Sequence, residues 1–119
     1  MAGVNSYKGF YAIHDHMPGA EDVLRIGGTV EFRTSGWSAQ LRPHERKGPT
    51  GINPFIFYVD LVLVPPPDGT GVAEVLTDFE LPELRLEPPT LEYQEVLFNV
   101  VGGDEDEPVP NRLEVEHPR

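Results

Sequence analysis

Two histidines separated by a single residue have the spacing best suited to chemistry in this sequence. His14 and His16 flank Asp15, and side chains two positions apart on an extended strand point to the same side. Two neutral imidazoles on one side of a strand can share a metal ion, and Glu21 lies close enough in sequence to add a carboxylate. The segment therefore predicts one of two things, a metal site or an exposed histidine pair without a ligand.

The same segment resembles the first motif of the cupin family. The residues that carry the resemblance are Gly9, His14, His16, Glu21 and Gly27. The resemblance implies a jelly roll in which two histidines and a glutamate hold iron, manganese or zinc. It also makes His44 the most plausible further ligand. Pro43-His44 departs from the second cupin motif, because the Pro-x-Gly turn is missing and Asn53 is distant.

Other chemistry has little support in the sequence. The chain has no cysteine, which excludes thiolate metal sites, iron–sulfur ligation and thiol nucleophiles. It contains no nucleophile elbow, no phosphate-binding glycine-rich loop and no dinucleotide fingerprint. We therefore expect a protein that is not an enzyme and that needs no cofactor, unless the histidines bind iron, manganese or zinc.

The distribution of charge limits the partners. The net charge is −11, and residues 51–119 carry fifteen acidic side chains against three basic ones. Such a surface repels phosphate backbones and anionic lipid, so we expect neither nucleic acid nor membrane as a partner. The only basic cluster is Arg42, His44, Arg46 and Lys47, which could contact an acidic patch such as the 104–107 turn of a neighbouring copy.

The elements that position these residues are short strands. Alternating apolar residues bounded by Gly and Pro recur along all 119 residues, and no long stretch has helical periodicity. Residues 24–32 and 37–42 read as strands joined by a tight turn at 34–36, and residues 55–64 read as a central strand. One domain, residues 1–119, is predicted: an all-β, antiparallel two-sheet sandwich of six to eight strands, immunoglobulin-like or jelly-roll.

The alternation also predicts which side chains are buried and which are exposed. The expected core residues are Trp37, Leu41, Phe57, Val59, Leu61, Val75 and Phe79. Apolar residues on the opposite faces would be left in contact with water and would form an interface between copies of the chain. The interface candidates are Leu76, Val96, Phe98 and Val100.

A second resemblance covers about residues 24–80. Gly28-Thr29-Val30, Thr34-Ser35-Gly36-Trp37 and Gly51-Ile52-Asn53-Pro54 are among the segments that resemble small, uncharacterised bacterial β-sandwich proteins. This resemblance implies the fold class and a bacterial origin, and it implies no activity.

Two hypotheses about function follow from the sequence. The first is a non-enzymatic binding or assembly module whose partner is a second copy of the chain or another protein. The second is a cupin-like metal protein that uses His14, His16, Glu21 and His44. No secretion signal is evident at the N-terminus and no disulfide can form, so we expect a cytoplasmic location.

Overall fold

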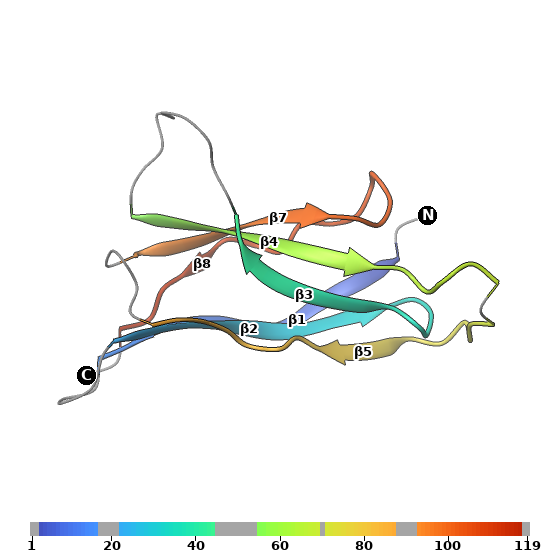
Figure 1. The fold of residues 1–119 in the computed structure, drawn as a ribbon, viewed down its shortest axis with the longest axis horizontal. Coiled ribbons are helices and arrows are strands. Elements are labelled where there is room, and N and C mark those ends of the chain that lie inside the picture. The colour runs from blue at the N-terminus through green and yellow to red at the C-terminus, as the bar shows by residue number, and fades with distance from the viewer. Residues whose placement is uncertain (1–2, 17–21, 45–54, 70, 88–92, 118–119) are drawn as a thin grey trace.

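The protein consists of two β-sheets that lie one above the other (Figure 1). The structure is a computed structural model, and it describes residues 3–16, 22–44, 55–69, 71–87 and 93–117. Sheet A contains β1 (Val4–Asp15), β2 (Val23–Phe32), β5 (Thr77–Glu80) and β6 (Leu84–Leu86). Sheet B contains β3 (Ser38–Pro43), β4 (Ile56–Val64), β7 (Glu95–Val101) and β8 (Leu113–Glu114). The predicted all-β fold of six to eight strands is confirmed.

None of the described residues belongs to a helix. It follows that these parts of the chain contain no helix long and apolar enough to cross a membrane.

The two sheets differ in strand direction. In sheet A, β2 is antiparallel to β1, β5 and β6. In sheet B, β4 is antiparallel to β3 but parallel to β7, so the prediction of antiparallel pairing throughout is wrong. The reason is the path of the chain, which leaves sheet B after β4, forms β5 and β6 in sheet A, and then returns. A strand reached by such a crossover can run in the same direction as the strand before it.

The predicted hairpin at 34–36 is also wrong. The segment 33–37 carries the chain from β2 in sheet A to β3 in sheet B, and these two strands do not pair. Gly36 makes this passage with a φ of 92°, and a Cβ atom there would lie 2.9 Å from the Cβ of Pro66. Glycine thus suits a crossing between sheets here as well as it would suit a hairpin turn.

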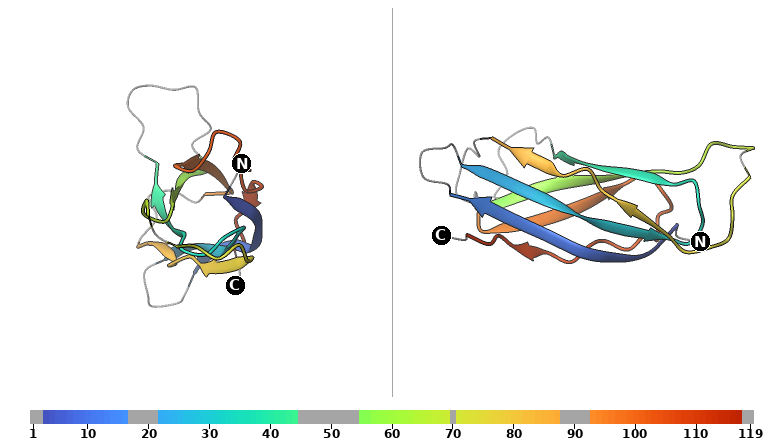
Figure 2. Two further views of the ribbon diagram at one scale, coloured as in Figure 1. Left: turned by 90° about the vertical axis from the view of Figure 1, so that its right-hand side faces the viewer. Right: turned by 90° about the horizontal axis from the view of Figure 1, so that it is seen from below.

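The two sheets meet along one side, where the C-terminal segment adds to β1. A parallel bridge joins Ile13 to Glu116. The amide of His14 donates to the carbonyl of Glu116 at 2.8 Å, and the amide of Glu116 donates to the carbonyl of Ala12 at 2.9 Å. In the end-on view of Figure 2 the strands surround a common interior. This seam brings the residues after β8 beside the end of β1.

The interior between the sheets is filled by aliphatic and aromatic side chains. Its buried apolar members are Val4, Ala12, Leu24, Ile26, Val30, Phe32, Ala39, Leu41, Val59, Leu61, Leu63, Leu81, Tyr93, Val96, Phe98 and Val115. Among the predicted core residues, Leu41, Val59 and Leu61 are confirmed as buried. Three others, Trp37, Phe57 and Phe79, are partly buried and pack against this core.

Three of the expectations about burial need correction. Val75 is 54% exposed, because β5 begins only at Thr77 and Val75 lies outside the sheet. Val96 and Phe98 are buried inside a single chain, because their face of β7 points to the interior and not to solvent. These two side chains therefore do not form the exposed apolar face that was expected on β7, and Val100 is half-buried. Among the interface candidates only Leu76, which is 58% exposed, lies fully at the surface.

Candidate metal site

The end of β1 places His14 and His16 on the same side, as their spacing predicts. Their rings stack with centroids 4.0 Å apart and an angle of 15° between the planes. A bulge precedes them, where the pairing with β2 shifts register between Lys8 and Tyr11 and Gly9 has a φ of 60°. Beyond the bulge, Ala12 and His14 are the buried residues of the strand. His14 is 2% exposed, so the expectation of an exposed pair is wrong for this residue.

A third histidine, which the sequence analysis missed, completes the group. His117 follows Glu116 in the seam, and its ring centroid is 5.2 Å from that of His14 and 5.4 Å from that of His16. One nitrogen from each of the three rings lies within 4.8 Å of the other two. The sequence does contain a pattern that includes His117, because it continues the alternation of Leu113 and Val115 and so lies on their side of an extended strand. Nothing in the sequence indicates that this segment pairs with β1.

A carboxylate joins two of the rings. Oδ2 of Asp22, the residue before β2, lies 3.2 Å from Nε2 of His14 and 3.1 Å from Nδ1 of His16. The predicted ligand Glu21 lies outside the described residues, and its neighbour Asp22 supplies the carboxylate at this place. A carboxylate that accepts from histidines fixes their orientation and tautomer, as it does in many metal sites.

Two of these contacts indicate which nitrogens of His14 and His117 carry a proton. An ionised carboxylate can only accept, so His14 donates from Nε2 to Asp22. A carbonyl oxygen also can only accept, so His117 donates from Nε2 to the Tyr93 carbonyl at 3.2 Å. Each neutral imidazole has only one N–H, so the lone pair of each of these two neutral rings is on Nδ1.

A nitrogen of His16 faces a nitrogen of His117. Nε2 of His16 and Nδ1 of His117 are 3.2 Å apart. Because Nδ1 of His117 is the acceptor, a proton on Nε2 of His16 forms a hydrogen bond between the two rings, and a metal ion bound by both nitrogens would take the place of that proton. Ligand nitrogens in a tetrahedral zinc site, with bonds of 2.0–2.1 Å, are about 3.3 Å apart, which is close to the observed spacing.

The lone pair on Nδ1 of His14 is buried without a partner among the described residues. Nδ1 of His14 has no hydrogen bond within the described part of the structure, although it is shielded from solvent. An unsatisfied buried polar atom costs about 1–3 kcal/mol, so natural proteins seldom keep one without a reason. A bound cation would use this atom. The three histidines with Asp22 therefore fit a divalent transition metal such as zinc.

His44, the fourth ligand predicted from sequence, does not belong to this group. It follows β3 in sheet B, where its Nδ1 lies 2.6 Å from Oδ1 of Asp60. Its position therefore supports no cupin-like set made of His14, His16 and His44.

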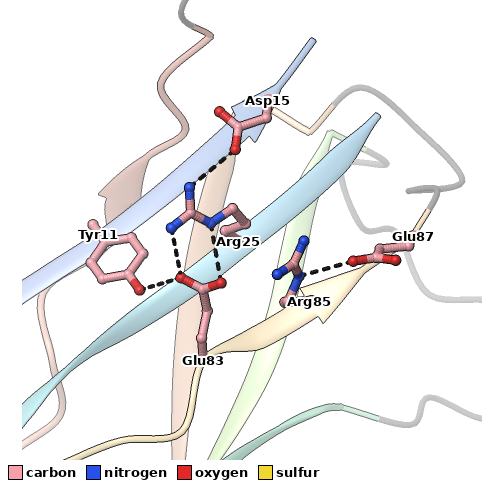
Figure 3. Close-up of polar contacts among 6 residues, drawn as sticks. All are labelled: Tyr11, Asp15, Arg25, Glu83, Arg85 and Glu87. Atoms are coloured by element: carbon pink, nitrogen blue, oxygen red, sulfur yellow. Dashed lines mark hydrogen bonds and ion pairs between the residues drawn. The ribbon is translucent and has the colours of Figure 1, made fainter. Parts of the chain in front are cut away.

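A second polar cluster covers the outer face of sheet A (Figure 3). The guanidinium of Arg25 on β2 forms two bonds of 3.1 Å to Glu83 and one of 3.1 Å to Asp15. The hydroxyl of Tyr11 donates to the same Glu83 carboxylate at 2.5 Å. The pKa of Glu83 lies below its ordinary value because of the hydrogen bonds from Arg25 and Tyr11. These groups bind one another, so the cluster ties β1, β2 and the segment before β6 together.

Comparison with known proteins adds no family to this description. No protein-family model matches the sequence, and neither a curated protein nor a solved structure matches the chain.

Proposed function

We propose that this protein is a non-enzymatic β-sandwich module that binds one divalent transition metal ion, with zinc as the best fit. The ligands are His14, His16 and His117, and Asp22 orients two of the rings. The observation that carries the proposal is the group of three imidazoles whose nitrogens lie within 4.8 Å of one another, together with the buried Nδ1 of His14, which has no hydrogen-bond partner within the described residues. Neutral imidazoles in that arrangement are the ligands that zinc and its neighbours in the first transition row prefer.

The metal would connect parts of the chain that are distant in sequence. His14 and His16 belong to β1 and its end, whereas His117 belongs to the C-terminal segment, and the pair His16–His117 spans 101 positions. The site therefore lies across the seam between the two sheets. We propose a mainly structural role for the ion, within a sandwich of the immunoglobulin-like or jelly-roll class.

Calorimetric titration of ZnCl₂ into untagged, chelator-treated protein tests this function. We expect one ion per chain, and we expect His16→Ala and His117→Ala to weaken binding by about 100-fold or more. His44→Ala is the matched control, because this histidine lies outside the group. Asp22→Asn should weaken binding about 10- to 100-fold through loss of orientation.

Cobalt(II) gives an independent readout, because its visible absorption differs between four-coordinate and six-coordinate sites. We expect the intense bands of a four-coordinate site, and we expect them to disappear in the His16→Ala, His117→Ala double variant. Absence of saturable zinc binding, or binding that this double variant leaves unchanged, would contradict the proposal.

A further inference from the structure

A row of three polar side chains crosses the outer face of sheet B. Arg42 on β3 is paired in register with Asp60 on β4, and Asp60 is paired with Asn99 on β7. The neighbouring residues Val59 and Leu61 point into the core, so Asp60 points away from it. The row therefore lies on the side of the sheet that faces outward, at the middle of the central strand.

Asp60 is unusual for a carboxylate on this face, because it is only 7% exposed. Its Oδ1 accepts from Nδ1 of His44 at 2.6 Å and from Nδ2 of Asn99 at 3.1 Å. Its Oδ2 faces Nε of Arg42 at 3.7 Å, which is an ion pair but too long for a hydrogen bond. Burial raises the pKa of Asp60, but the hydrogen bonds and the charge of Arg42 outweigh that effect and leave the pKa below its ordinary value.

Asp60 holds Arg42 and His44 beside it and leaves their outer nitrogens accessible. His44 uses Nδ1 for Asp60 and is anchored by its amide, which donates to the Tyr58 carbonyl at 3.0 Å. Nε2 of His44 and the terminal nitrogens of Arg42 have no hydrogen-bond partner within the described ranges. The side chains are 32% and 54% exposed, respectively, so both can be reached from solvent.

A hollow of about 270 Å³ lies next to these donors and is lined by Arg42, Pro43, His44 and Asp60. Pockets for drug-sized molecules measure roughly 300–1,000 Å³, so this hollow suits a smaller molecule. The guanidinium of Arg42 brings a positive charge to the lining of this hollow, on a chain whose net charge is −11.

We propose that this hollow binds a small carboxylate, with the fork of Arg42 on its two oxygens and the ring of His44 beside them. Guanidinium and carboxylate match in geometry, because two parallel N–H groups meet two oxygens. Asp60 is a positioning residue that holds His44 through Nδ1 and pairs with Arg42. The site shares no residue with the histidine group of β1, so a test of one site gives no result about the other.

The test is an NMR titration of the whole chain at about pH 6. Sodium acetate is the probe, and sodium chloride and inorganic phosphate are compared at equal ionic strength. We expect acetate to cause saturable shifts at the His44 ring and at the Arg42 side chain, and chloride to cause none. Equal shifts with chloride, or no saturation with acetate, would overturn the site, and tighter binding of phosphate would overturn its assignment to carboxylates.

Variants separate a binding role from a structural one. We expect Arg42→Gln to weaken acetate binding about tenfold or more, and Arg42→Lys to weaken it by a smaller factor because the fork is lost. Arg112→Gln is the matched control, since Arg112 is an exposed arginine directly before β8 that pairs with Glu95 at 3.1 Å. Amide spectra of each variant check that the fold is kept. Acetate affinity unchanged in Arg42→Gln would overturn the proposal, and affinity unchanged in Arg42→Lys would overturn the forked contact.

Discussion

Nε2 of His16 and Nδ1 of His117 lie 3.2 Å apart although 101 positions separate the two residues. The contact depends on the seam, where Ile13 bridges to Glu116 and places the C-terminal segment against β1. A ligand held between these nitrogens would stabilise the seam, because it binds the folded chain and not the separated strands. An increase in the stability of the chain on metal binding would therefore show that the metal is held across this contact between His16 and His117.

We expect zinc to raise the stability of the chain. A ligand at 100 times its dissociation constant stabilises the folded state by about 2.7 kcal/mol, which corresponds to an increase in Tm on the order of 10 °C for a domain of this size. Thermal unfolding followed by circular dichroism, with zinc and with a chelator, measures the difference. His44→Ala should show the same increase, whereas His117→Ala should show none. An equal increase in His117→Ala would place the ion elsewhere.

His14 should be replaceable without loss of the fold. We expect His14→Leu to change the free energy of unfolding by less than about 1 kcal/mol, because the variant removes a buried nitrogen that has no partner. Asp22 loses one donor, but its side chain is 43% exposed and water can replace that donor. Urea unfolding without metal gives the comparison, and zinc titration of the same variant should show much weaker binding. A loss above about 3 kcal/mol would mean that the imidazole is needed for packing.

The sequence could predict the part of the site that depends on local geometry. Positions 14 and 16 share a side on any extended strand, and their rings indeed stack. His117 and Asp22 could not be assigned in this way, because their places depend on which strands pair. Glu21 follows His16 closely in sequence, but only the start of β2 shows that its neighbour Asp22 is the acidic residue that contacts the rings.

The fold, too, could be predicted only where it depends on local sequence and not where it depends on strand pairing. Alternation identified the strands around Leu61 and Phe98, but it carries no information on strand direction, so the parallel pairing of β4 with β7 was not predicted. Alternation also continues past the end of a strand, and Val75 was therefore placed in the core although β5 begins at Thr77. The glycine in 34–36 suited a turn of either kind and could not distinguish a hairpin from a passage between sheets.

Two leucines test the assignment of the core. Leu61 on β4 is 0% exposed and Leu76 is 58% exposed. We expect Leu61→Ala to lower the free energy of unfolding by about 2–5 kcal/mol, because a cavity replaces the side chain in a packed interior. Leu76→Ala should change it by less than about 0.5 kcal/mol, because its side chain is already largely in water. Similar losses for both variants in urea unfolding would contradict the arrangement of the sheets.

Glu107 should be necessary for anchoring the start of β1. Its carboxylate is buried and accepts from the amides of Gly3 and Val4, each at 3.0 Å. Glu107→Gln turns one acceptor into a donor that faces an amide, so we expect a loss of about 1–3 kcal/mol. Glu105→Gln is the control, because Glu105 is exposed in the same turn. Hydrogen exchange at Val4 would show where stability is lost, and unchanged exchange in Glu107→Gln would contradict the anchoring role.

The cluster in Figure 3 predicts how stability depends on pH. Hydrogen bonds from Arg25 and Tyr11 lower the pKa of Glu83 below its ordinary value of 4.5 in the folded chain. The unfolded chain therefore takes up the proton more readily, so the contribution of Glu83 is present above about pH 4.5 and is lost as pH falls through the folded pKa. We expect Glu83→Gln to be less stable than the natural chain at pH 7, by at most about 1 kcal/mol because water screens a partly exposed pair. The difference in stability between the two chains should narrow as the pH is lowered from about 5.

Urea unfolding at several pH values measures this difference, with Glu87→Gln as control because Glu87 pairs with Arg85 at the exposed surface. A difference that stays constant between pH 7 and pH 3 would show that Glu83 acts through packing and not through its charge.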